Sequence, residues 1–341
     1  MKILVMMTGG TISTTVNKSG HLDANGKETV SLLADYFKKH VSSAVDFDYC
    51  HPLDILSENM TFQRLNRLID AFRGLDQSKY AAIVVAHGTD TLAYTSSLLA
   101  LTLAGWLKVP LFLVSSDLTL TDANANGYDN FRAACQLAMG GFGAGVYVPY
   151  RNSDGVIYLH QGAHLRQCQN FTADFFSEDM CPFTEAKPYV AEAEHPILDQ
   201  LARLTECVMR IEPYVGIDYS LFRLTEHIRG VLHGSYHSST ACVERRGSGE
   251  PYTRRSALYL AEECKRRGID VFLAPLPKSM RETLGTYSST AELIGAGMQP
   301  VFSLTNETAY MKLTLAYSLG YEGEEIIPFL ERNVANERLS Y

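Results

Sequence analysis

Two short stretches place hydroxyl and carboxyl side chains directly after runs of apolar residues. The stretch "ILVMMTGGTIS" leads into Thr8-Gly9-Gly10-Thr11, and "VVAHGTDTLAY" leads into Gly88-Thr89-Asp90-Thr91. A threonine hydroxyl can act as a nucleophile, and a carboxylate can accept a hydrogen bond from an amino group. Glycines let the backbone approach a ligand closely and expose its N–H groups. Taken alone, each stretch could be only a tight turn or a helix cap.

The apolar runs before these turns predict buried parallel strands, because they are continuous instead of alternating. Strands are expected at Ile3–Met7, Ala82–Ala86 and Leu111–Val114, and helices at Thr91–Gly105 and Tyr128–Met139. Alternating strands and helices are typical of an open α/β sheet with right-handed crossovers. Ligands bind beyond the carboxyl ends of the strands in such sheets. Both turns are predicted to lie there.

The pattern weakens around residues 185–212, and a second α/β unit follows. We predict an N-terminal α/β domain over residues 1–190, a linker over 191–212 and a smaller C-terminal α/β domain over 213–341. The acidic segment Tyr321–Asn333 is expected to form a solvated terminal helix or loop. The short strands and helices expected in the C-terminal domain are Gly230–Leu232, Val271–Leu273, Val301–Ser303, Ser256–Arg267 and Glu307–Leu319.

Composition narrows the class of protein. The chain has 341 residues and a net charge of −8 at pH 7. No block of Lys and Arg occurs, which argues against a nucleic-acid partner. No apolar run approaches the length of a membrane span, and the strand expected at Ile3 leaves no room for a signal peptide. A cytoplasmic protein is therefore expected, with its seven scattered cysteines reduced.

Together the two turns closely resemble the two signature motifs of the bacterial-type L-asparaginase/glutaminase family. "SENMT" (Ser57–Thr61) resembles the family's substrate-gripping serine loop, and "SSDLTLTDANANGYDNF" (Ser115–Phe131) resembles its G-S-x-x-P…D-G-x-x-N segment. "TNETAYMKL" (Thr305–Leu313) resembles its final helix. The resemblance implies a small amino-acid or amide substrate, no metal or organic cofactor, and a homodimer or homotetramer. The family's site lies at a subunit interface.

The resemblance also implies a role for individual residues. Thr11 would attack the side-chain amide carbon, and Thr89 would be the second catalytic hydroxyl. Asp90 and Ser57 would hold the α-amino and α-carboxylate ends of the amino acid. Backbone N–H groups near Gly88 would stabilise the oxyanion, an interaction often worth a few kcal/mol. The other candidates for substrate contact are Gly10, Asp117 and Glu292.

This sequence departs from the family where the catalytic lysine belongs. No lysine occurs between Lys108 and Lys187, and the corresponding stretch is "LHQGAHLRQCQNFTADFFSED". One alignment of this stretch puts Arg166 at the lysine position, and another puts Gln167 there. An arginine would keep the positive charge but cannot act as a base, because its pKa exceeds about 12.

A second departure concerns the family's catalytic tyrosine, which follows the nucleophile by about ten residues. Here "KSGHLD" places His21 at that point. Histidine is a better base than tyrosine near neutral pH, so His21 is a candidate to activate Thr11. A surface position in a loop is the alternative. The histidine pairs His160/His164 and His233/His237 have no acidic or cysteine partner at metal-site spacing except Cys242, so no metal site is predicted.

Three hypotheses follow from these residues. The first is a hydrolase that converts the side-chain amide of L-asparagine into aspartate and ammonia through an acyl-threonine. The second is an enzyme of the same fold with a shifted substrate, such as an isopeptide or a D- or modified amino-acid amide. The third is a non-catalytic amino-acid-binding protein, because the family lysine and tyrosine are both replaced.

Overall fold

Six strands form a mostly parallel sheet in the N-terminal part of the computed structural model, which describes residues 1–341 apart from 17–21, 25, 194, 248–251, 284–285 and 341. The strand order is β4-β1-β5-β6-β7-β8, and only β8 runs antiparallel to its neighbour. The strands are β1 (Lys2–Met7), β4 (Asp46–Cys50), β5 (Ala82–Ala86), β6 (Pro110–Val114), β7 (Gly145–Arg151) and β8 (Ile157–Gln161). The predicted α/β class is confirmed.

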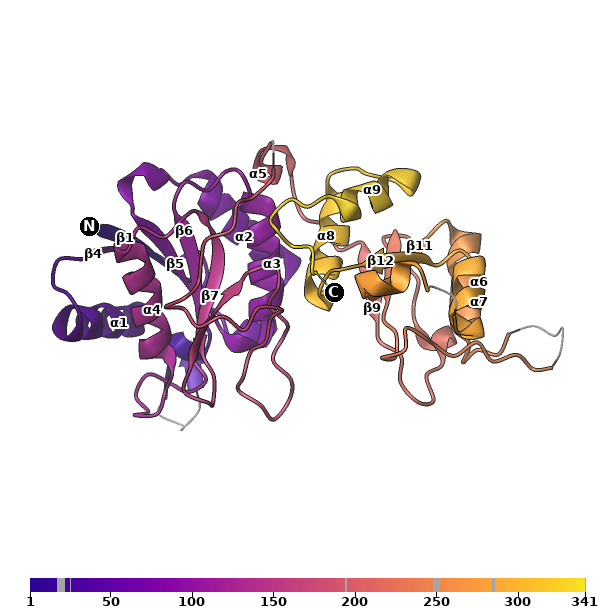
Figure 1. Ribbon diagram of the computed structural model, residues 1–341, viewed down its shortest axis with the longest axis horizontal. Helices are drawn as coiled ribbons and strands as arrows, with labels where there is room; N and C mark the ends of the chain where they lie inside the picture. Colours follow the sequence, from indigo (N-terminus) through magenta and orange to yellow (C-terminus); the bar gives the residue numbers. More distant parts are fainter. Residues whose placement is uncertain (17–21, 25, 194, 248–251, 284–285, 341) are drawn as a thin grey trace. The chain divides into compact units, whose positions relative to one another are not determined.

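Helices cover both faces of this sheet (Figure 1). On one face, Phe37 and Phe131 from the first and fourth helices pack on Ile3, Val5 and Val84 of the central strands. The helices are α1 (Gly26–His40), α2 (Phe62–Arg73), α3 (Leu92–Leu103), α4 (Gly127–Met139) and the short α5 (Ile197–Gln200). A two-stranded ribbon of β2 (Thr14–Val16) and β3 (Leu22–Ala24) follows β1.

Local sequence explains where α2 begins. Thr61 caps α2, because its side chain accepts a hydrogen bond from the Arg64 N–H. Leu65, Leu68 and Phe72 recur at helical spacing and are buried. The helix α3, whose sequence is apolar on most faces, is buried on nearly all sides.

A second sheet of four parallel strands lies in the C-terminal part, in the order β12-β11-β10-β9. Its core joins Val231 and Val271 to Leu258 and Ala261. The elements are β9 (Val208–Ile211), β10 (Gly230–His233), α6 (Ala257–Arg267), β11 (Asp270–Leu276), α7 (Ser288–Gly295), β12 (Gln299–Phe302), α8 (Asn306–Ser318) and α9 (Ile326–Glu331). The acidic segment expected to be solvated contains α9, whose Ile326, Phe329 and Leu330 are buried.

The chain divides into two compact units. The N-terminal unit comprises Met1–Leu201 together with Asn333–Glu337, and the C-terminal unit comprises Ala202–Arg332 and Arg338–Tyr341. Strand β9 lies inside the segment expected to be a linker. Its sequence, Val-Met-Arg-Ile, is interrupted by Arg210 and gives no continuous apolar run. The return of Asn333–Glu337 to the N-terminal unit carries no sequence signal that we recognised.

Candidate active site

Two turns follow the carboxyl ends of the adjacent strands β1 and β5. The Thr8 hydroxyl donates a hydrogen bond to the Ala86 carbonyl at 2.8 Å, which ties the two strand ends together. The Gly10 N–H donates to the Ile55 carbonyl at 2.8 Å. Gly9 and Gly10 have φ angles of 107° and 83°, a conformation that disfavours any residue with a side chain. The chain then enters a short 3₁₀ helix at Thr11.

The two turns are in contact through their glycines. A Cβ atom built on Gly10 would lie 2.1 Å from the Cα of Gly88, a distance that no side chain can occupy. Thr11 directly follows Gly10, and Thr89 directly follows Gly88. The structure therefore brings the two predicted catalytic threonines to adjoining turns at one edge of the sheet.

Ser57 and Asp90 are joined to each other beside these turns. The Ser57 hydroxyl donates to the Asp90 carboxylate at 2.9 Å, and the Asp90 N–H donates to the Ser57 oxygen at 3.2 Å. The Thr91 hydroxyl also donates to the Ser57 carbonyl at 3.0 Å. A hydroxyl and a carboxylate are thus fixed at one place, with Asp90 exposed to solvent.

A pocket of 450 Å³ opens next to Thr89 and Asp90. Asp117, Tyr150 of β7 and the loop Gln167–Ala173 complete its lining. Asp117 is held by its own loop, because its carboxylate accepts from the N–H groups of Leu118 and Asn126. The predicted residues Thr89, Asp90 and Asp117 therefore share one pocket.

Gln167 contacts the turn that carries Thr89. Its side-chain amide donates to the Thr89 carbonyl at 2.8 Å and accepts from the Ala93 N–H at 3.3 Å. Arg166 is exposed and is not among the lining residues of the pocket, and its backbone pairs with Phe176. Arg166 and Gln167 were the two candidates for the lysine position, and the structure places Gln167 next to the site.

Residues 2–193 match the family model described as Asparaginase, N-terminal. The chain belongs to the asparaginase family. It is 26% identical to the L-asparaginase of Thermococcus kodakarensis over 99% of each chain. It is also 26% identical to a Methanococcus maripaludis protein named as a subunit of glutamyl-tRNA(Gln) amidotransferase, over 98% of this chain and 80% of that protein.

Solved structures share the asparaginase fold over the whole chain. The thermostable L-asparaginase of Thermococcus kodakarensis gives a TM-score of 0.75 at 23% identity, with 100% of both chains covered. The L-asparaginase I of Vibrio cholerae gives 0.72 at 20% identity, with 99% and 98% covered. Among the described residues, no helix is long and apolar enough to cross a membrane.

A buried histidine lies under the second asparaginase turn. Burial lowers the pKa of His87 to about 4, so the imidazole is neutral at pH 7. A neutral ring can carry its proton on Nδ1, which lies 2.7 Å from the Gly88 carbonyl and is assigned here as the donor. His87 thereby holds the backbone of the turn at the Gly88 carbonyl.

Tyr150 and Cys168 are among the lining residues that the sequence of this asparaginase-family chain did not lead us to expect. Burial raises the pKa of Tyr150 well above its ordinary value, so its hydroxyl remains protonated. Burial also raises the pKa of the Cys168 thiol, and the carboxylates of Asp174 and Asp90 add to this effect. A thiol that resists ionisation is a poor nucleophile, so Cys168 is not a candidate nucleophile of the site.

Glu292 and His21 are the predicted residues that remain. Glu292 belongs to the C-terminal unit, where its carboxylate pairs with Arg245 at 3.0 Å. His21 lies outside the residues that the structure describes. In the described part of the chain, no group of three or more His, Cys, Asp or Glu residues is arranged to hold a metal ion.

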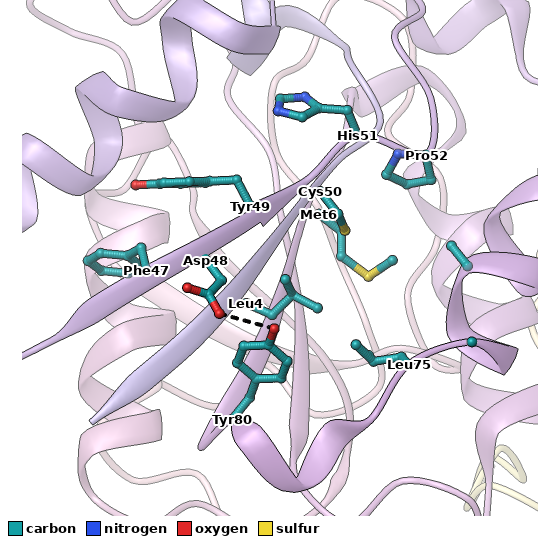
Figure 2. Close-up of a pocket in the computed structure, with 12 residues that line it drawn as sticks. Leu4, Met6, Phe47, Asp48, Tyr49, Cys50, His51, Pro52, Leu75 and Tyr80 are labelled. Atoms are coloured by element: carbon teal, nitrogen blue, oxygen red, sulfur yellow. Dashed lines mark hydrogen bonds between the residues drawn. The ribbon is translucent and has the colours of Figure 1, made fainter.

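A larger pocket of 720 Å³ lies away from the asparaginase motifs, at the edge strand β4 (Figure 2). Leu4 and Met6 of β1 and Leu75 contribute its apolar lining. Tyr80 donates a hydrogen bond to Asp48 at 3.2 Å within it. It contains neither motif threonine, so its greater volume does not make it the candidate active site.

Proposed function

We propose that this protein hydrolyses the side-chain amide of L-asparagine, or of a close analogue, to a carboxylic acid and ammonia. The observation that carries the proposal is the contact between Gly10 and Gly88, which sets Thr11 and Thr89 in adjoining turns beside the Ser57–Asp90 pair. Hydroxyl nucleophiles next to groups that can hold an amino acid suit amide hydrolysis through an acyl-enzyme.

The proposed reaction proceeds in two halves. The Thr11 hydroxyl attacks the amide carbon, the C–N bond breaks, and the hydroxyl proton leaves with the nitrogen as ammonia. Water then hydrolyses the acyl-threonine and restores the hydroxyl. Asp90 accepts hydrogen bonds from the α-ammonium group, and the Ser57 hydroxyl, which donates to Asp90 without substrate, turns to donate to the α-carboxylate. Backbone N–H groups of the Gly88–Thr89 turn stabilise the oxyanion.

Gln167 serves this reaction as a positioning residue. A carboxamide neither gains nor loses a proton near neutral pH, so Gln167 cannot replace a lysine as a base. Its two hydrogen bonds instead hold the Thr89 turn against the start of α3. Proton transfer from Thr11 then needs another group, and His21 is the proposed base.

The names of the relatives support an amide substrate and leave two candidates for its identity. The relative from Thermococcus kodakarensis is named an L-asparaginase, and this chain spans nearly its whole length. The Methanococcus maripaludis relative, named for glutamyl-tRNA(Gln) amidotransferase, matches at the same identity. A second candidate is therefore an amide-hydrolysing subunit that works with a partner protein, with L-glutamine as substrate.

Ammonia release from L-asparagine, L-glutamine, their D-forms and β-aspartyl peptides tests the proposal. We expect release from L-asparagine, with kcat lowered roughly a thousandfold or more in Thr11→Ala and in Thr89→Ala. Thr121→Ala is the matched control, because this exposed threonine pairs with Thr119 in its own loop and does not line the pocket. Saturable binding of aspartate without release from any compound would instead support the non-catalytic hypothesis.

The same proposal includes a homodimer or homotetramer in the cytoplasm. Light scattering of the purified protein measures the first, and cell fractionation measures the second. A strictly monomeric protein that hydrolyses L-asparagine would refute the oligomer and leave the proposed reaction standing.

A further inference from the structure

The loop Gln167–Ala173 closes one side of the candidate pocket and is anchored at both ends. On the first side, the Arg166 N–H donates to the Phe176 carbonyl at 2.9 Å. On the second side, the Asp174 carboxylate accepts from the N–H and the hydroxyl of Ser153, both at 2.7 Å. Phe175, which follows, is completely buried. The loop is therefore a fixed wall of the pocket.

Contacts inside the loop define its shape. The Thr172 N–H donates to the Gln169 carbonyl at 3.3 Å, and the Cys168 thiol donates to the Thr172 carbonyl at 3.0 Å. These bonds turn the chain sharply around residue 171. Phe171 at the tip has a φ angle of 65°, in the left-handed region, and its side chain is fully exposed.

Phe171 combines two unfavourable features at the rim of a pocket. A left-handed backbone is costly for a bulky residue, and a fully exposed aromatic ring gains nothing from burial. Asparagine or glycine would adopt this backbone conformation more readily. Strained residues held by well-anchored surroundings concentrate at sites that bind ligands. Phe171 is also one of the residues that line the pocket.

The remaining lining has acidic and neutral character. Asp90 and Asp117 contribute carboxylates, and Gln167, Gln169 and Asn170 contribute amides. Among the described residues that line the pocket, none is Lys, Arg or His. Such a lining favours a ligand with a protonated amine and disfavours a ligand that carries a second anionic group. An aromatic ring at the rim adds a surface on which apolar or cationic groups of the ligand can pack.

We propose that the site accepts a side-chain amide whose nitrogen carries an apolar or aromatic substituent, and that Phe171 packs on this substituent. The inference rests on the proposed function and specifies its substrate class. An unsubstituted amide leaves as ammonia, which is too small to use a ring at the rim. A substituted amide leaves as an amine: Thr11 forms the ester bond, the C–N bond breaks, and the amine takes the hydroxyl proton. Water then releases the acid.

Hydrolysis of L-asparagine and of L-aspartic acid β-anilide by the same preparations tests this inference. Phe171→Asn removes the ring and keeps a residue suited to the left-handed backbone. We expect the ratio of kcat/KM for the anilide to that for L-asparagine to fall about three- to tenfold. Phe171→Trp should restore the ratio. Phe176→Asn is the matched control, because Phe176 is half-exposed in the same segment but does not line the pocket.

Each outcome separates the substrate class from the reaction itself. An unchanged ratio in Phe171→Asn, or an equal fall in Phe176→Asn, overturns the role of Phe171. Hydrolysis of L-asparagine by the wild-type protein without any aniline release overturns the substrate class and leaves the proposed function intact. If the wild-type protein hydrolyses neither compound, both the substrate class and the proposed function are overturned.

Discussion

The motif turns and the loop Gln167–Ala173 border the same site, but they are held in different ways. The motif turns meet backbone to backbone, with Gly10 packed directly against Gly88. The loop is tied down at its two ends, where Asp174 binds Ser153 and Arg166 pairs with Phe176. One region is held by direct contact between two backbones, and the other by hydrogen bonds at its ends and among its own residues.

This difference determines which side chains can vary. Where two backbones touch, every residue except glycine is excluded, so the motif is stringent and recognisable in a sequence. Where a loop is anchored at its base, the residues between the anchors can change without loss of the fold. The chemistry of the pocket can therefore shift through residues 167–173 while the threonine turns stay constant.

The largest effect should come from a side chain placed between the motif turns. Gly10→Ala would force a Cβ to within 2.1 Å of the Gly88 Cα, and we expect a loss of roughly 3–5 kcal/mol in the free energy of unfolding. Chemical denaturation measures this loss. Gly155→Ala is the matched control, because its φ of 82° is almost the same and nothing lies within 4 Å of the added atom.

Gly155→Ala should cost only the left-handed backbone penalty, about 1 kcal/mol. Equal losses in the two variants would mean that backbone conformation, and not contact between the turns, makes glycine necessary at position 10.

A smaller effect is expected from acid. Burial lowers the pKa of His160 to about 3, whereas an unfolded chain binds this proton near 6.5. The unfolded state therefore holds more protons as pH falls from 6.5 toward 3, and the free energy of unfolding decreases over that range. The Nδ1 atom of His160 lies 2.8 Å from the Ser177 hydroxyl.

His160→Asn removes this proton uptake. From pH 7 to pH 5, we expect the free energy of unfolding of the wild type to fall by about 1–2 kcal/mol more than that of the variant. Denaturation at each pH would measure this change. A difference that is independent of pH would show that His160 titrates normally in the native protein. His87, whose pKa is lowered to about 4, continues to contribute in both proteins.

The smallest effect concerns the residue that joins the loop to the second turn. Gln167→Ala removes the bonds to the Thr89 carbonyl and the Ala93 N–H, and we expect kcat/KM for L-asparagine to fall about tenfold. Gln136→Ala on the exposed side of α4 is the control. An unchanged rate in Gln167→Ala would mean that the glycine contact alone positions Thr89.

The sequence predicted the regular elements of the site better than its loop. Continuous apolar runs identified β1, β5 and β6, because parallel strands that are buried on both faces carry few polar residues. Strand β9 escaped notice because Arg210 interrupts its apolar sequence. The choice between Arg166 and Gln167 depended on which side chain faces inward, and one residue of alignment shift reverses that choice. Tyr150 lies far from both motifs, so only the folded sheet brings it to the pocket.

The return of Asn333–Glu337 to the N-terminal unit has a consequence for synthesis of the protein. The Glu192 N–H donates to the Val334 carbonyl, the Asn336 amide donates to Gln161, and the buried Glu337 carboxylate accepts from backbone N–H groups of its own segment. The segment Asn333–Glu337 emerges from the ribosome only after residues Ala202–Arg332 of the C-terminal unit have been translated. The unit that carries the threonines therefore reaches its complete set of contacts late, and a fragment ending at Leu201 would never acquire them.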